Sequence, residues 1–533
     1  MTEGNGEVKA LPKGWIQLKL ENVAEWGSGG TPSRKNPDYF KGNIPWIKTG
    51  ELKGKYIRSA EERITKEAIN ESSAKIFPKG SVAIAMYGAT IGKTSIIDID
   101  ASTNQACAVA KPLKEILFNE FLYYYLSSQT RKFVELGKGG AQPNISQTLL
   151  KSHPILLPPI NEQERIVEKI EELFSDVDQG VESLKTAKKQ LKVYRQAVLK
   201  WAFEGKLTEA WRKPHQATLK TGEALLAEIK AERENRYQQQ LAEWETAVKE
   251  WEAIGKMGKK PNKPQTLQEP SPLRTTELAV LPELPFNWCY VRAEAISDFI
   301  TKGTTPSKEN LFSGFGDVPF IKVYNLTDNG LLDFTANPTF VSTETHNGFL
   351  GRSKVLPNDV LMNIVGPPLG KVSLVPKTFG KWNINQAVVR YRTTDMLMSK
   401  YLMYYLLSQV TIDRMSKRAK ATAGQFNLTL EICRDTEIPI CSPKEQEQIV
   451  QEIESRLSIC DQLEATIIEN LQKAEALRQS ILKQAFEGKL VPQDPNDEPA
   501  EKLLERIQAE RLVNGNTGKK SKPSHQQLTL QEL

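Results

Sequence analysis

The chain has 533 residues, a formal net charge of +6 and an apolar fraction of 39%. This length accommodates several domains with separate cores. No apolar run approaches the roughly 20 residues that cross a bilayer, and residues 1–14 lack the apolar stretch of a signal peptide, so we expect a cytoplasmic protein. Five cysteines without CxxC spacing and four scattered histidines argue against a metal site or a disulfide framework.

Residues 1–159 are expected to form a first globular unit. Strand-like pieces at 81–88, 94–99 and 106–110 are rich in β-branched or small apolar residues. The aromatic segment 121–129 has the apolar spacing of a core helix.

From residue 160 the apolar residues recur in steps of three and four, which is typical of a coiled coil or a long helix pair. Asn161 followed by Glu164 resembles a capping start signal, and Gly205 is a plausible stop. We therefore predict a central helical region at 160–211, whose helix would extend roughly 60 Å at 1.5 Å per residue.

The connector at 212–283 changes composition along its length. Residues 221–255 are rich in Glu, Ala, Gln and Lys and are expected to be helical, whereas 256–285 are rich in Pro and Lys and are expected to form an extended linker. The sequence LLAEIKAER at 225–233 is echoed as LLERIQAER near Leu504.

A second globular unit at 284–442, a second helical region at 443–491 and a partly disordered tail at 492–533 complete the chain. RQAVLKWAFEGKL at 195–207 returns as RQSILKQAFEGKL at 478–490, a shift of 283 residues. Such repetition predicts two like halves, and because the sequence between the matching positions differs, one fold would serve two recognition tasks.

The expected fold is α+β, with two globular mixed α/β domains related by a pseudo-two-fold repeat and joined by two long antiparallel coiled-coil helices. Neither helix can bury its apolar stripe alone, which favours pairing. The alternative is that each stripe packs on its own globular unit. The residues expected in the helix pair are Ile166, Ile170, Leu173, Val177, Leu184, Ile449, Ile453, Leu463, Ile467 and Leu477.

Loops that combine glycine with lysine or arginine recur in both globular units. Small residues let a backbone approach a phosphate, and cationic side chains neutralise it, although each loop could also be a solvated turn. GATIGKT at 88–94 resembles a phosphate-binding P-loop but has three residues between its glycines where four are needed. Its counterpart at 366–372 carries two prolines, which lack the backbone N–H that cradles phosphate, so we do not expect nucleotide hydrolysis.

The chain resembles the specificity subunit of a type I restriction–modification enzyme. The matching features are the starts at Trp15 and Trp288, the Thr-Pro-Ser turns, the segments IPWIKTGEL and VPFIKVYNL, the paired Asn-Gln-Ala, QPNIS with QFNLT, and PPINEQERIV with RQAVLKWAFEGKLT. They span almost the whole chain twice, apart from the connector and the tail.

The resemblance implies that each globular unit is a target-recognition domain reading one half of an asymmetric bipartite site in double-stranded DNA. The helices would set the spacing and dock two methyltransferase subunits. Two restriction and translocation subunits would complete the complex. S-adenosylmethionine, ATP and magnesium would bind those partners, while this chain would be non-catalytic and bind no cofactor or membrane.

The sequence contains no recognisable methyltransferase tetrapeptide or nuclease core, which argues against a self-contained enzyme. A scaffold that does not bind DNA is the other alternative. The residues expected to contact DNA are Thr31, Ser33, Arg34, Lys35, Lys48, Lys93, Lys138, Gln142 and Asn144 in the first domain, and Thr305, Ser307, Lys308, Lys322, Tyr324, Lys371, Arg418, Lys420, Gln425 and Asn427 in the second. Among these, the paired Gln and Asn residues could instead cap a loop.

Overall fold

The chain folds into two compact units. Unit 1 comprises residues 1–185 and 468–533, and unit 2 comprises residues 186–467. Each unit combines one globular mixed α/β domain with segments of both long helices, which confirms the predicted fold class. The computed structural model describes residues 11–137, 144–264, 269–366, 368–422 and 425–515.

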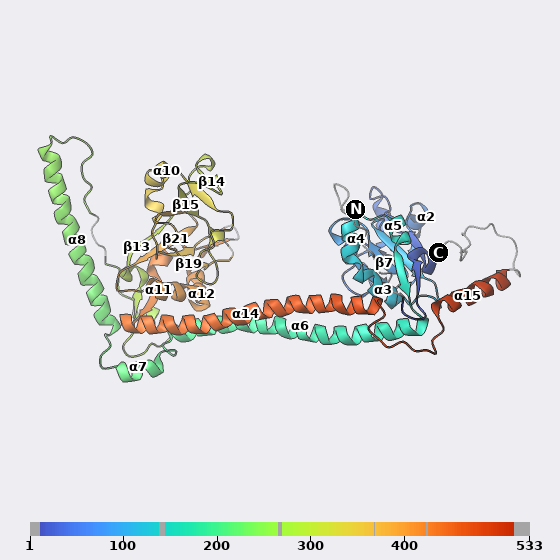
Figure 1. The fold of residues 1–533 in the computed structure, drawn as a ribbon. Helices are drawn as coiled ribbons and strands as arrows, with labels where there is room; N and C mark the ends of the chain where they lie inside the picture. Colours follow the sequence, from blue (N-terminus) through green and yellow to red (C-terminus); the bar gives the residue numbers. More distant parts are fainter. Residues whose placement is uncertain (1–10, 138–143, 265–268, 367, 423–424, 516–533) are drawn as a thin grey trace, which may run out of the picture. The chain divides into compact units, whose positions relative to one another are not determined.

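The globular domain of unit 1 is built on two sheets and a separate strand pair (Figure 1). Its strands are β1 (Ile16–Lys19), β2 (Ala24–Ser28), β3 (Ile44–Ile47), β4 (Tyr56–Ile57), β5 (Glu62–Ile64), β6 (Ile76–Phe77), β7 (Val82–Ala85), β8 (Thr94–Ile97), β9 (Ala101–Thr103), β10 (Cys107–Pro112) and β11 (Pro154–Leu157). The sheet orders are β2-β10-β7-β8-β4 and β5-β3-β9-β6, and β1 pairs with β11. Its helices are α1 (Leu20–Val23), α2 (Lys66–Asn70), α3 (Asn119–Ser128), α4 (Thr130–Leu136) and α5 (Gln147–Ser152).

Strand β7 lies at the centre of this domain because both of its faces are apolar. Val82 and Ile84 face the core that contains α3, whereas Ala83 and Ala85 face a second core with Ile47. A strand that is buried on both faces has no polar alternation, and β7 fits this pattern.

Unit 2 repeats this design with different loops. Its strands are β12 (Cys289–Arg292), β13 (Ser297–Lys302), β14 (Phe312–Ser313), β15 (Val318–Ile321), β16 (Thr339–Val341), β17 (Lys354–Val355), β18 (Val360–Asn363), β19 (Val372–Leu374), β20 (Trp382–Ile384), β21 (Val388–Thr393), β22 (Lys420–Thr422), β23 (Gln425–Asn427) and β24 (Glu437–Ile440). The sheet orders are β13-β21-β18-β19 and β14-β16-β15-β20-β17, with β12 paired to β24 and β22 to β23. Its helices are α10 (Thr343–Asn347), α11 (Ser399–Leu407), α12 (Gln409–Arg418) and α13 (Leu430–Asp435).

The two long helices are α6 (Ile160–Phe203) and α14 (Pro443–Phe486), and within each unit their segments run side by side and antiparallel (Figure 1). In unit 1, Arg478 of α14 pairs with Asp178 of α6. In unit 2, Arg195 of α6 pairs with Asp461 of α14 at 2.6 Å. The ion pairs that link the helices therefore recur in the two halves of the repeat.

The ends of the long helices also pack on the globular domains, so part of the alternative arrangement is present as well. Ile166 and Ile170 are fully buried in the core of unit 1, and Ile449 and Ile453 are fully buried in the core of unit 2. One part of the apolar stripe on each long helix therefore packs on a globular domain, and another part faces the other long helix.

The far end of each long helix is anchored by a phenylalanine. Phe486 packs edge-on against Phe121 of α3, with ring centroids 5.2 Å apart. Phe203 packs in the same way against Tyr401 of α11, at 5.1 Å. Each globular domain therefore holds the beginning of one long helix and the end of the other.

Two residues expected in the apolar stripe, Leu463 and Leu477, are 48% and 50% exposed. In their region of α14 the buried apolar positions are Cys460 and Ile467. A helix with 3.6 residues per turn drifts away from a strict seven-residue repeat, so a stripe counted in threes and fours misplaces some positions. Leu173, Val177 and Leu184 are partly buried.

The connector contains α7 (Glu209–His215), α8 (Gly222–Ala253) and α9 (Thr275–Leu278), and a further helix, α15 (Ala500–Gly515), lies in the predicted tail. Leu225 and Ile229 of α8 are buried in unit 2, and Leu503 and Ile507 of α15 are buried in unit 1. The sequence echo thus corresponds to two helices that dock alike. Within the described residues, no helix is both long and apolar enough to cross a membrane.

Candidate nucleic-acid interface

A hairpin turn and a distant asparagine meet at equivalent places in the two units. In unit 1, Tyr87 precedes the turn between β7 and β8, and it forms an isolated β-bridge with Asn144. In unit 2, Val365 precedes the turn between β18 and β19, and it bridges Asn427. The Gly-Lys turns and the Asn segments that the sequence singled out are therefore brought together twice.

Glycines fix both turns against a neighbouring helix. Gly92 has a φ of +79°, and a Cβ added there would lie 2.9 Å from Thr130. Gly370 has a φ of +81°, and its added Cβ would lie 2.4 Å from Ile412. Each turn joins two antiparallel strands rather than a strand and a helix, so neither presents the helix N-terminus of a nucleotide-binding P-loop.

Each turn ends in a lysine with no carboxylate partner among the described residues. Lys93 is exposed and Lys371 is partly buried, and neither forms an ion pair within 4 Å there. Lys93 also lines a small hollow of about 280 Å³ together with Lys53 and Tyr123. These lysines are therefore available to a phosphate.

The Thr-Pro-Ser turn of unit 1 is followed by a cation that is already engaged. Arg34 pairs with Glu62 at 2.7 Å, and its guanidinium carbon lies 4.1 Å from the ring centroid of Phe40. Thr31 is partly buried, while Ser33 and Lys35 are exposed. Of these four predicted contacts, Arg34 has a clear role inside the domain.

Lys48 pairs with the same carboxylate as Arg34, that of Glu62. Its Nζ lies 3.0 Å from Glu62 and 3.0 Å from Glu61, and these hydrogen bonds raise the pKa of Lys48. Its counterpart Lys322 lies 5.8 Å from the ring centroid of Tyr324. The structure thus places Arg34 and Lys48 in one cluster around Glu62, whereas Lys93 lies at the end of the turn that Tyr87 and Asn144 bridge.

The other predicted residues of unit 2 differ in how far they are engaged. Ser307 accepts a hydrogen bond from Asn310 at 3.1 Å, Lys308 is exposed, and the hydroxyl oxygen of Thr305 is buried without a partner among the described residues. Tyr324 is 42% exposed, and its hydroxyl donates to the carbonyl oxygen of Asn337 at 3.1 Å.

Arg418 pairs with the buried carboxylate of Glu437, so this cation also serves the domain. Lys420 and Gln425 lie on the paired strands β22 and β23, and their side chains lie outside what the structure describes. Lys138 and Gln142 lie outside the described residues.

The sequence repeat also contains buried polar residues that, within each unit, tie the start of the globular domain to a long helix, and their role was not predicted. Trp15 Nε1 donates to Glu162 at 3.1 Å, and Trp288 Nε1 donates to Glu445 at 2.9 Å. Burial raises the pKa of Glu162. The signal was present in the sequence, because the Trp and Glu-Gln positions match between the halves.

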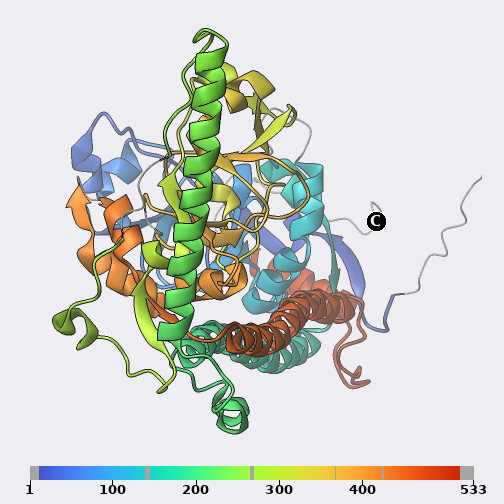
Figure 2. The ribbon, with the colours of Figure 1, turned by 90° about the vertical axis from the view of Figure 1, so that its left-hand side faces the viewer.

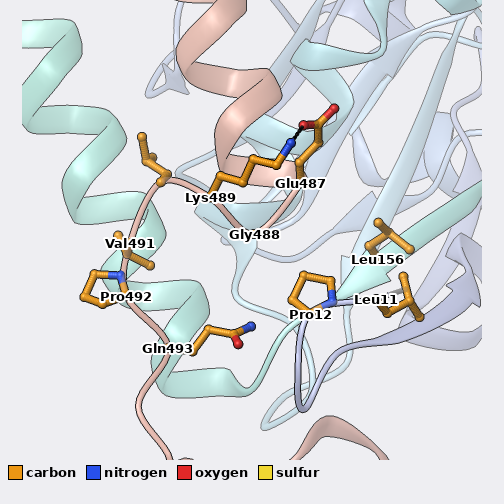
Figure 3. A pocket seen from close by; sticks show the side chains of 10 residues that line it. Leu11, Pro12, Leu156, Glu487, Gly488, Lys489, Val491, Pro492 and Gln493 are labelled. Atoms are coloured by element: carbon orange, nitrogen blue, oxygen red, sulfur yellow. Dashed lines mark hydrogen bonds and ion pairs between the residues drawn. The ribbon is translucent and has the colours of Figure 1, made fainter. Parts of the chain in front are cut away.

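A hollow of about 920 Å³ lies in unit 1 beside the end of α14 (Figure 3). Leu11, Pro12 and Leu156 line one side, and residues 487–493 line the other. Its charged side chains, Glu487 and Lys489, pair with each other at 2.5 Å. In the part of the chain that is described, no group of three or more His, Cys, Asp or Glu residues is placed to hold a metal.

The family model described as "Type I restriction modification DNA specificity domain" matches residues 12–192 and 285–473. These segments contain the two globular domains and parts of both long helices. Two family domains therefore cover more than half of the chain, in register with the internal repeat.

The chain is 25% identical to the type I restriction enzyme EcoKI specificity subunit of Escherichia coli strain K12, over 96% of this chain and 98% of the relative. It is 30% identical to the EcoR124I/EcoR124II specificity subunit of Escherichia coli over 200 residues, which are 36% of this chain and 49% of that relative. A solved structure from work titled "Structural basis underlying complex assembly and conformational transition of the type I R-M system" matches with a TM-score of 0.59. It is 18% identical and covers 90% of this chain and 99% of its own, which supports the fold.

Proposed function

Because the chain belongs to the family of type I restriction–modification DNA specificity domains, we propose that it is the DNA-recognition subunit of such a system. The observation that carries this proposal is that the same arrangement of residues occurs in both globular domains. In each domain a hairpin turn bridged to an asparagine ends in a lysine without a carboxylate partner among the described residues, Lys93 in one and Lys371 in the other. The rest of the two domain surfaces differs in sequence.

Each domain would read one half of an asymmetric bipartite site. Cations next to a glycine turn suit phosphate oxygens, while polar side chains that differ between the domains suit base edges in the major groove. We assign Lys93 and Lys371 to phosphates because both halves of the repeat carry them. Arg34, Lys48 and Arg418 are assigned to domain stability, since each is paired with a carboxylate.

The long helices would set the distance between the half-sites and dock methyltransferase subunits. Two such subunits would bind S-adenosylmethionine and methylate adenine. Two restriction and translocation subunits would use ATP and magnesium. The chain itself would be non-catalytic, and the complex would act on DNA in the cytoplasm.

The deciding experiment selects bound sequences from a random DNA pool, using the full chain assembled with its methyltransferase partner and S-adenosylmethionine. Two short, different half-sites at a fixed spacing are expected. A single undivided motif would overturn the two-reader proposal, and no enrichment by a folded complex would favour a scaffold. Incubating the pure chain with labelled S-adenosylmethionine and DNA tests the self-contained enzyme, for which we expect no transfer.

A further inference from the structure

The connector of unit 2 forms an arm that the proposed function does not use. We define the arm as residues 237–264. It comprises the distal half of α8 and a strap, residues 254–264, that returns along the helix (Figure 2). The proximal half of α8 is anchored through buried Leu225 and Ile229, and the anchoring ends where Arg236 pairs with Asp298 at 2.8 Å. Beyond that point, the hydrogen bonds of the described residues stay within α8 and the strap.

Two tryptophans of α8 hold the strap in place. Trp244 Nε1 donates to the carbonyl oxygen of Pro261 at 3.1 Å, and Trp251 Nε1 donates to that of Gly258 at 3.2 Å. Both indole N–H groups therefore hold the backbone of the strap against α8. The segment predicted to be an extended linker is instead an extended strap tied to a helix.

The strap carries four lysines and no acidic residue. Lys263 lies 5.5 Å from the ring centroid of Trp244, and Lys256 and Lys260 each lie 5.9 Å from that of Trp251. Lys259 is exposed. Within the described chain, no carboxylate lies within 4 Å of any of the four amines, in contrast to Lys230 on the proximal half, which pairs with Glu269 at 3.2 Å.

We propose that the arm is a second, sequence-independent DNA contact, in which Lys256, Lys259, Lys260 and Lys263 bind phosphates beside the half-site read by the domain of unit 2. This inference rests on the proposed function. Four like charges within residues 256–263, none with a carboxylate within 4 Å among the described residues, repel one another. A DNA backbone relieves that repulsion while releasing its own counter-ions. The indole rings support the amines without neutralising them.

The length of the arm suits this role. The helical part, residues 237–253, extends about 25 Å at 1.5 Å per residue, which corresponds to about seven base pairs at 3.4 Å each. The arm would therefore contact DNA next to the half-site. An acidic partner protein could also be attracted to the strap, and the experiment separates the two.

The test replaces Lys256, Lys259, Lys260 and Lys263 together by Gln in the full chain assembled with its methyltransferase subunits. A matched control replaces Lys213, Lys220, Lys230 and Lys400 by Gln, which removes the same charge from lysines of unit 2 that already pair with carboxylates. The affinity for the selected DNA site is measured at salt concentrations from about 50 to about 200 mM, the range over which phosphate contacts change affinity strongly.

We expect the slope of log affinity against log salt to become less negative in the strap variant by up to about 3.6, or about 0.9 for each phosphate that is no longer neutralised. The base preferences at both half-sites should be unchanged, and the control should keep the wild-type slope. An unchanged slope in the strap variant would overturn the inference. An unchanged slope together with a failure of methyltransferase assembly would identify a protein as the partner of the strap. Failure of the wild-type complex itself to select a site would instead reject the proposed function.

Discussion

The indole Nε1 of Trp288 lies 2.9 Å from Oε2 of Glu445, and both side chains are buried. Glu445 also accepts from Arg212 Nε at 2.6 Å and from the hydroxyl of Thr208 at 3.0 Å. This carboxylate joins the start of the second domain, the start of α14 and the segment that follows α6. Its counterpart Glu162 accepts from Trp15 in unit 1.

The two buried glutamates are expected to respond differently to loss of charge. Glu445→Gln leaves the guanidinium of Arg212, whose side chain is 11% exposed, without its carboxylate, so we expect a decrease of about 2–4 kcal/mol in unfolding free energy. Glu162→Gln resembles the protonated form that burial favours, as the raised pKa of Glu162 indicates, and should cost less than about 1 kcal/mol. Urea unfolding at pH 7 measures both, and equal decreases would contradict this assignment.

A buried histidine predicts how the stability of unit 1 depends on pH. His153 is 5% exposed and lies beside Phe133, and burial lowers its pKa to about 4. An unfolded chain binds this proton near pH 6.5, so stability should be complete above pH 6.5 and fall as the pH drops toward 4, by up to about 3 kcal/mol.

The matching variant is His153→Phe, which keeps an aromatic ring but cannot titrate. The difference in unfolding free energy between wild type and variant should shift in favour of the variant between pH 7 and pH 5. Urea unfolding curves at the two pH values measure this difference. Parallel pH dependences would show that His153 does not cause the effect.

Lys93 and Lys48 distinguish a DNA contact from a structural cation. Lys93→Gln should weaken DNA binding uniformly across sequences and reduce the salt slope by about 1, because it removes one phosphate contact. Lys48→Gln should leave that slope unchanged, because Lys48 is already bonded to Glu61 and Glu62. Fluorescence titrations at several salt concentrations measure both variants, and the reverse ranking would refute the assignment.

Substitutions at the C-terminal ends of the two long helices should each lower the stability of one unit. Phe486→Ala should destabilise unit 1 by about 3 kcal/mol or more, since it leaves a cavity beside Phe121. Phe203→Ala should do the same in unit 2 beside Tyr401. Hydrogen exchange should therefore speed up in 119–128 for the first variant and in 399–407 for the second. Exchange that speeds up in the opposite unit would contradict the crosswise anchoring.

Much of this architecture could be predicted because the sequence contains an internal repeat. The long helices follow from apolar spacing, and α15 was signalled by its likeness to the start of α8. The side chains that DNA could meet were harder to predict. From the sequence, Arg34 and Arg418 fall in segments expected to be basic loops, yet Arg418 ends α12, and the carboxylates that engage them, Glu62 and Glu437, lie 28 and 19 residues away in sequence. Spacing alone does not reveal such partners.

The distance between the half-sites should follow the length of the helix pair. One heptad inserted into α6 after Lys185, and another into α14 after Ile467, adds seven residues to both antiparallel helices at matching places. Seven residues add about 10.5 Å and nearly two whole helical turns, so the apolar stripe and its facing ion pairs keep their register. At about 3.4 Å per base pair, the unread spacer should lengthen by about three base pairs while both half-sites stay the same. Insertion into α6 alone should disrupt the pair, because the Asp178–Arg478 and Arg195–Asp461 ion pairs could no longer form at the same time. Selection from a random DNA pool reads both outcomes, and an unchanged spacer in the double insertion would reject the helices as the element that sets it.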